Sequence, residues 1–182
     1  MLMSSRVTAM PALPAVLCLL LAVGGCSPAF NWREVRPDAT RLALLLPCKP
    51  DKAQKQVPLG GQATTLSMQG CDAGDATFAV AVATLPNAAG AAEVLTQWQA
   101  ATLANMKAAP GSSRTTVLRV SGVNAPAQAV LVSAQGKRPD GATVQGQAAY
   151  FADGAQVFQV VMYADKVNAE AAETFFSSLR FE

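Results

Sequence analysis

Cysteine is the residue type with the clearest chemical potential in this sequence, because its thiolate is both a nucleophile and a metal ligand. The 182-residue chain has four cysteines and no histidine. Without histidine, Ser-His-Asp and Cys-His nucleophilic sites are excluded, as are metal sites and proton shuttles that use imidazole. The sequence also has no nucleophile elbow, phosphate-binding loop or dinucleotide-binding glycine pattern. We therefore predict no catalytic residue, no metal ligand and no cofactor.

Cys26 follows a segment that is typical of an export signal. Arg6 precedes a run rich in Ala, Leu and Val that extends from residue 9 to residue 23 and is broken by Pro11 and Pro14. A charged region followed by an apolar region of this length is the pattern of a secretory signal peptide. A membrane-spanning helix would need about 20 apolar residues and is disfavoured by the two prolines. The segment is therefore predicted to direct export.

The last four residues of this segment are Val23-Gly24-Gly25-Cys26. They resemble the lipobox of bacterial lipoprotein signal peptides. In that family a diacylglyceryl group alkylates the cysteine thiol, the chain is cut just before the cysteine, and the new amine is acylated. The resemblance implies cleavage between Gly25 and Cys26 and lipidation of Cys26. An ordinary signal with an incidental cysteine is the alternative.

The predicted lipid would hold the protein at a membrane. Each buried acyl CH₂ contributes about 0.8 kcal/mol, so the two or three chains of a lipoprotein anchor firmly where one chain would not. Ser27 stands where many enterobacterial lipoproteins that remain in the inner membrane have Asp. The resemblance therefore implies a location in the outer membrane, facing the periplasm.

Cys48 and Cys71 remain once Cys18 leaves with the signal and Cys26 carries lipid. In an oxidising compartment such a pair is predicted to form a disulfide. Strand-like segments 54–59 and 62–68 flank a Gly-Gly hairpin signal, and a turn centred there leaves the two cysteines two residues from direct pairing. A bulge or a looser turn would close that gap. The alternative, a redox or metal-binding pair, would need CxxC-like spacing or further ligands.

The chain is predicted to consist of a signal peptide (1–25), a lipidated tether (26–40) and one domain (41–182), since the mature part has the size of a single domain. Fully extended, residues 27–40 would reach about 50 Å. Trp32 and Val35 could dock on the domain, or Phe30 and Trp32 could rest at the bilayer interface. Docking is the preferred interpretation.

Sequence periodicity predicts an α+β domain. Strands are expected at 42–46, 54–59, 62–68, 76–85, 115–120, 127–134, 142–151 and 155–163, because these segments alternate or are short apolar runs bounded by turn signals. A helix is expected between Asn87 and Pro110, and another after Asn168, because apolar residues recur there at helical spacing. Hairpins imply an antiparallel β-sheet, and we predict that it packs against two amphipathic helices.

Three features carry a further resemblance. They are the strand end Leu44-Leu45-Leu46-Pro47-Cys48-Lys49-Pro50, the long central helix, and the closing Phe175-Phe176-Ser177-Ser178-Leu179-Arg180-Phe181. Over residues 41–181 the pattern is similar to the α/β sandwich of the PsbP and DcrB families, which are exported and often lipid-anchored. The resemblance implies an accessory or assembly role, and no functional residue can be carried over from it.

Charge gives no sign of a nucleic-acid partner. The chain has 14 basic and 12 acidic residues, without the clustered basic face of a nucleic-acid binder. Lys49, Lys52 and Lys55 are interpreted as part of a solvated edge strand, and Lys137 and Arg138 as an exposed hairpin tip.

The sequence therefore predicts a non-enzymatic lipoprotein that binds an envelope protein or another component of the cell envelope. One alternative is a periplasm-facing carrier with a pocket between sheet and helices, lined by Gln145, Gln147, Gln156 or Gln159 beside carboxylates. The other is a hydrolase that uses two carboxylates. The acidic residues at 72, 75, 140 and 153 lie in Gly-containing turns, where Asp is favoured for backbone reasons.

Overall fold

The computed structural model describes residues 29–122 and 129–182. Its strands are β1 (Arg33–Val35), β2 (Leu42–Leu46), β3 (Asp51–Leu59), β4 (Gln62–Ala73), β5 (Ala76–Thr84), β6 (Arg114–Val117), β7 (Val130–Lys137), β8 (Thr143–Asp153), β9 (Gln156–Ala164) and β10 (Arg180–Phe181). The helices are the 3-10 turn η1 (Ala88–Gly90), α1 (Ala91–Asn105) and α2 (Ala169–Ser177). The predicted lipidation and cleavage residues, Gly25 and Cys26, lie outside this part of the chain.

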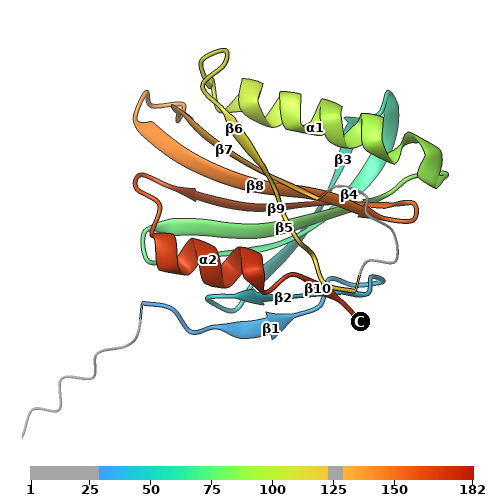
Figure 1. Cartoon of the computed structure of the whole chain (residues 1–182), viewed down its shortest axis with the longest axis horizontal. Coiled ribbons are helices and arrows are strands. Elements are labelled where there is room, and N and C mark those ends of the chain that lie inside the picture. Colours follow the sequence, from blue (N-terminus) through green and yellow to red (C-terminus); the bar gives the residue numbers. More distant parts are fainter. Residues whose placement is uncertain (1–28, 123–128) are drawn as a thin grey trace, which may run out of the picture.

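A seven-stranded antiparallel sheet in the order β3-β4-β5-β9-β8-β7-β6 forms the centre of the fold (Figure 1). The hairpin predicted around Gly60 and Gly61 is confirmed, with Leu59 opposite Gln62. Both glycines have positive φ, a conformation that residues with a Cβ rarely adopt. The two-residue turn therefore fixes the register of the long β3–β4 ladder.

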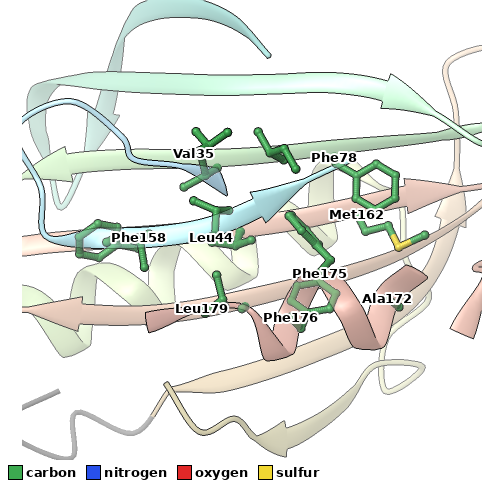
Figure 2. Packing of buried hydrophobic residues seen from close by; sticks show 14 of the residues in the cluster. Val35, Leu44, Phe78, Phe158, Met162, Ala172, Phe175, Phe176 and Leu179 are labelled. Carbon is green, nitrogen blue, oxygen red and sulfur yellow. The ribbon is translucent and has the colours of Figure 1, made fainter. Parts of the chain in front are cut away.

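The first face of the sheet is covered by α2 and by a small sheet in the order β1-β2-β10 (Figure 1). Fully buried Phe78 of β5 and Phe158 of β9 point into this layer, where Phe175 of α2 meets the Phe78 ring edge-on at 5.1 Å (Figure 2). The apolar run 42–46 forms β2 of the small sheet, which is why nearly all its side chains are buried.

The opposite face of the sheet is covered by α1 (Figure 1). Because successive strand residues point to opposite faces, Ala79, Ala81 and Ala83 of β5 lie on this side. Ala81 and Ala83 pack in one buried cluster with Leu95 and Trp98 of α1. The small alanine side chains let the helix pack close to the sheet.

The predicted α+β class, with a mainly antiparallel sheet and two helices, is confirmed. The helices are unequal: α1 has 15 residues and α2 has nine. The buried residues of α1 all precede its last two turns, ending at Trp98. The prediction that both helices are amphipathic is therefore not confirmed.

Helix and strand ends differ from the prediction at two places. Helix α1 ends at Asn105 rather than at Pro110, because Lys107 adopts a positive φ that stops the helix. Strand β6 ends at Val117 and β7 begins at Val130, so the predicted strands 115–120 and 127–134 are each shifted by a few residues. The predicted start of the second strand falls on residues 127 and 128, outside the described chain.

The segment expected to be a tether packs on the domain from residue 30 onward. Strand β1 pairs antiparallel with β2, and the rings of Phe30 and Trp32 meet Phe78 edge-on at 6.2 and 6.1 Å. Val35 is buried in the same cluster. Aromatic burial and backbone pairing together outweigh solvation of this segment. The described part of this segment therefore agrees with the docking interpretation.

Cys48 and Cys71 form a disulfide, with sulfur atoms 2.01 Å apart and Cα atoms 6.0 Å apart. The β3–β4 ladder ends at the pair Asp51 and Gly70. Pro50 cannot donate a backbone hydrogen bond to extend the ladder. The chain preceding β3 therefore leaves the register, and this departure closes the predicted two-residue gap.

We expect the purified processed protein to show no thiol reactivity from Cys48 or Cys71 until it is reduced. Replacing both residues by Ala should lower the free energy of unfolding by about 3 kcal/mol, because the disulfide restricts the unfolded chain. Thiol titration and urea unfolding with and without reductant measure the two effects. Two reactive thiols in the unreduced native protein would contradict the assignment.

Candidate functional site

A pocket of about 770 Å³ lies between α1 and the sheet, within the usual size range for small-molecule sites. Its apolar lining comes from the β3–β4 hairpin and from α1. These residues include Val57, Leu59, Leu66, Met68, Trp98 and Met106. The pocket thus lies on the face of the sheet opposite α2.

Close approach of α1 to the sheet at two points bounds this pocket. Near the start of the helix, Val94 lies against Gly60, where an added Cβ would be 2.7 Å from the valine methyl. Just after the helix end, an added Cβ on Gly136 would be 2.1 Å from the carbonyl oxygen of Met106. Glycine at both points lets the helix segment approach the sheet closely. Between these two points the space remains open toward β3 and β4.

Gln159 connects the sheet to the helix inside this pocket. Its Nε2 donates to Thr102 Oγ1 at 2.8 Å and to the Tyr150 hydroxyl at 3.0 Å. Both donor hydrogens of the amide are used, so its orientation is fixed. The side-chain oxygen is then an acceptor held in a defined position on the wall.

Tyr163 also lines the pocket. Burial raises the pKa of its hydroxyl to about 12, and the neighbouring Tyr150 contributes in the same direction. Burial also raises the pKa of Tyr150, although hydrogen bonds from Thr102 and Gln159 oppose this shift. Tyr163 therefore keeps its proton at neutral pH and can donate a hydrogen bond.

Charged side chains at the rim are all basic. Lys55 of β3, Lys137 of β7 and Arg138 of the following turn line the pocket, and no Asp or Glu is among its described lining residues. Arg138 forms an ion pair with Asp165 at 2.8 Å. Neither lysine forms an ion pair within the described chain. The rim therefore favours an anionic group.

The four glutamines predicted to line a pocket do not come together. Only Gln159 lines this one, because strand alternation places the others on the opposite face. Gln145 accepts a hydrogen bond from the backbone of Val167, and Gln156 donates to the backbone oxygen of Ala39. Their roles are structural, and the predicted neighbouring carboxylates are absent from this lining.

The turn aspartates have local partners. Asp72 accepts from the Thr77 hydroxyl at 2.6 Å, Asp140 accepts from the backbone of Ala142, and Asp153 pairs with Arg41 at 2.9 Å. Within residues 29–122 and 129–182, no three His, Cys, Asp or Glu side chains gather in a way that could hold a metal ion. The described acidic residues offer no convergent acid/base pair at the pocket.

The sequence predicted only solvent-exposed positions for Lys55 and Lys137, and both residues line the pocket. Lys55 does lie on an edge strand and Lys137 at the end of β7, as expected. Their position on the α1 face follows from the register of each strand. The available signal was alternation: Lys55 shares a face with Val57 and Leu59, which are partly or fully buried.

A separate ion-pair network joins β1 to β10 on the other side of the molecule. Glu34 pairs with Arg36 at 2.7 Å and also with Arg180, while Glu182 pairs with Arg36 at 2.5 Å and with Arg180 at 2.9 Å. Hydrogen bonds from these guanidinium groups lower the pKa of both carboxyls below the ordinary value of 4.5. The network therefore favours their ionised forms.

Acid should weaken this network. Because the folded-state pKa values are depressed, their stabilisation is complete above about pH 4.5 and is lost as pH falls through the folded values. We expect the double change Glu34→Gln and Glu182→Gln to reduce the loss of stability between about pH 6 and pH 3. Urea unfolding across this range measures it, with Glu173→Gln on α2 as control. A loss of stability at low pH that is as large in the double variant as in the parent protein would contradict this role.

Comparison with known proteins gives no family for this chain: no protein-family model matches it, and the search of curated proteins found no match. Neither of the described helices has the length and apolar composition needed to cross a membrane. The function of the protein is therefore inferred from the sequence motif at Cys26 and from the pocket.

Proposed function

We propose that this protein is an exported, lipid-anchored lipoprotein whose domain is a non-enzymatic binding module of the cell envelope. The observation that carries the proposal is Val23-Gly24-Gly25-Cys26 at the end of a signal-like segment. The layered α+β domain supports it, since a sheet covered by helices is compatible with the α/β sandwich that the PsbP and DcrB resemblance implies. That resemblance also favours an accessory role.

Docking of the N-terminal segment supports a position close to the membrane. Phe30 contacts Phe78, and only four peptide steps separate Phe30 from Cys26. Four residues span about 14 Å at full extension, far less than the tether expected from sequence. A lipid on Cys26 would therefore hold the domain against the membrane surface, where it would meet an envelope protein or lipid component.

A small-ligand carrier is the second candidate, and the pocket beneath α1 is the observation that favours it. The lining combines apolar side chains with fixed polar groups such as the amide of Gln159, which is the usual make-up of a binding site. In this second candidate the anchored domain binds an amphiphilic small molecule instead of, or together with, a protein partner.

Membrane fractionation tests the proposed location. The protein should sediment with outer-membrane vesicles in a density gradient, should resist extraction by high salt, and should be released by detergent. Salt resistance separates a lipid anchor from electrostatic adsorption, which is screened within about 10 Å at 0.1 M salt. Recovery of the wild-type protein in the soluble fraction would overturn the proposal. Recovery with inner-membrane vesicles would overturn the outer-membrane location.

A further inference from the structure

We propose that the pocket beneath α1 binds a single-chain amphiphile with an anionic headgroup, with its chain along the apolar wall and its headgroup at Lys137. This inference rests on the proposed function in one respect, namely that the domain is a binding module. It adds the chemical class of the ligand and the residues that recognise each of its parts.

The apolar part of the ligand follows from the wall of the pocket. Trp98, Leu59 and Leu66 are buried members of the cluster between α1 and the sheet, and they also line the open space. Met68 and Met106 add flexible thioether side chains to the lining, which adapt to irregular apolar ligands. Burial of a flexible alkyl chain against this wall removes apolar surface from water on both sides.

The anionic part follows from the charge of the rim. Three basic residues and no acidic one line the described pocket, and the lysine ammonium groups have no ion-pair partner within the described chain. A protonated Tyr163 hydroxyl adds a neutral donor. A carboxylate or phosphate group accepts from donors of both kinds, whereas a cationic headgroup would be repelled.

The register of the sheet places Lys137 on the same side as the N-terminal segment. An added Cβ on Gly74, in the β4–β5 turn, would be 2.5 Å from the Phe30 ring. From this turn, Ala76 pairs with Ala164 and Ala164 with Gln145. Gln145 in turn pairs with Gln135 near the end of β7. The β4–β5 turn against Phe30 and the β7–β8 turn after Lys137 thus lie at one end of the sheet, and Figure 1 shows these two turns on the same side.

The position of Lys137 and the N-terminal segment at the same end of the sheet indicates where the ligand would come from. If Cys26 is lipidated, the short segment before Phe30 holds this end of the sheet toward the bilayer, where single-chain anionic amphiphiles partition. The headgroup class has two origins, a long-chain carboxylate or a lysophospholipid with a phosphate. The two share the chemistry that Lys137 recognises and are separated in the experiment below.

Tryptophan quenching by a brominated fatty acid tests the proposal. Trp98 lines the pocket, whereas Trp32 packs on the opposite face of the sheet. The chain from residue 26 onward with Cys26→Ser contains every contact described here and is used without detergent. Bromine quenches tryptophan only at short range. Therefore 9,10-dibromooctadecanoate should quench Trp98 fluorescence in a Trp32→Phe variant and leave Trp32 unquenched in a Trp98→Phe variant.

Charge variants test the headgroup. The change Lys137→Gln should weaken binding by about threefold, because it removes one charged contact at an exposed rim. The matched control Lys49→Gln, an exposed lysine outside the lining, should bind as the parent does. Octadecanol, which has the same chain without charge, should displace the probe less well than octadecanoate. Displacement by octadecanoyl lysophosphatidylglycerol at a lower concentration than octadecanoate would support a phosphate headgroup, and the reverse order a carboxylate.

Three results would overturn the proposal. Equal quenching of Trp32 and Trp98, or none, would place no ligand in the pocket, and equal displacement by octadecanol would remove the anionic class. An apolar peptide that displaces the probe better than octadecanoate would also overturn it in favour of a protein partner. If the quenching and displacement tests fail while the full protein still fractionates with membranes in a manner that depends on Cys26, only the ligand class is rejected. Loss of membrane fractionation rejects the proposed function.

Discussion

Replacing Cys26 by Ser should abolish incorporation of labelled fatty acid and leave the precursor uncut. The hydroxyl of Ser is not a substrate for the thioether step that the lipobox resemblance implies, and cleavage in that family follows lipidation. Without acyl chains the protein also loses the anchoring energy, about 0.8 kcal/mol for each buried CH₂. Metabolic labelling with a radioactive fatty acid, followed by fractionation, measures the loss.

Cys18→Ser is the matched control, because Cys18 lies in the same segment but has no lipobox residues before it. This variant should be labelled and processed like the parent protein. Normal labelling of Cys26→Ser would contradict lipidation at this residue. Loss of labelling in both variants would point to a general defect in export instead.

Phe78→Ala should lower the free energy of unfolding by about 3–5 kcal/mol, the usual cost of removing a fully buried aromatic ring. Phe78 has no exposed surface. Its ring meets Phe30 and Trp32 of the N-terminal segment and also Phe175 of α2, the last of which is seen in Figure 2. The truncated side chain should therefore loosen the docked segment as well as destabilise the core.

Urea unfolding measures the stability, and proteolysis of the segment before β1 measures its docking. Val117→Ala is the control, because Val117 is 77% exposed and should change stability little. If Phe78→Ala does not fold, Phe78→Leu should cost less than about 1.5 kcal/mol and keep the test open. Unchanged stability and unchanged proteolysis in both variants would contradict the central position of this ring.

Local signals explain why much of the fold could be predicted from sequence. The Gly60-Gly61 turn fixes a register by geometry alone, and the alternation of Phe78, Val80 and Val82 with alanines separates the two faces of β5. Asn168 caps α2 by accepting from the backbone of Ala171 at 3.0 Å, as its position before the helix predicted. Each of these features depends on residues only a few positions apart.

The pocket could not be predicted because it depends on pairing between distant segments. Lys55 and Lys137 line the same pocket only when β3 and β7 take their places on either side of the sheet. The glutamines show the same limit. Gln159 and Gln156 lie three residues apart on one strand, yet strand alternation sends them to opposite faces, and only the direction of the face decides which meets α1.

The composition of the N-terminal segment did not decide whether it docks on the domain or rests at a bilayer interface. Phe30 and Trp32 suit both a bilayer interface and a protein core, since amphipathic aromatics are favourable in either. Pairing of β1 with β2 and the buried partner Phe78 decide for the core. The consequence is a short connection to Cys26, on which the proposed position of the domain at a membrane depends.

The intact mass of the protein extracted from membranes by detergent tests the proposed anchoring most directly. We predict a chain that begins at Cys26 and carries a diacylglyceryl group on the thiol and an acyl group on the amine, with the Cys48–Cys71 disulfide intact. Base hydrolysis should remove the ester-linked chains in the same spectrum series. The mass of an unmodified chain, whether uncut or cut elsewhere with a free Cys26, would contradict the proposal that this protein is a lipoprotein.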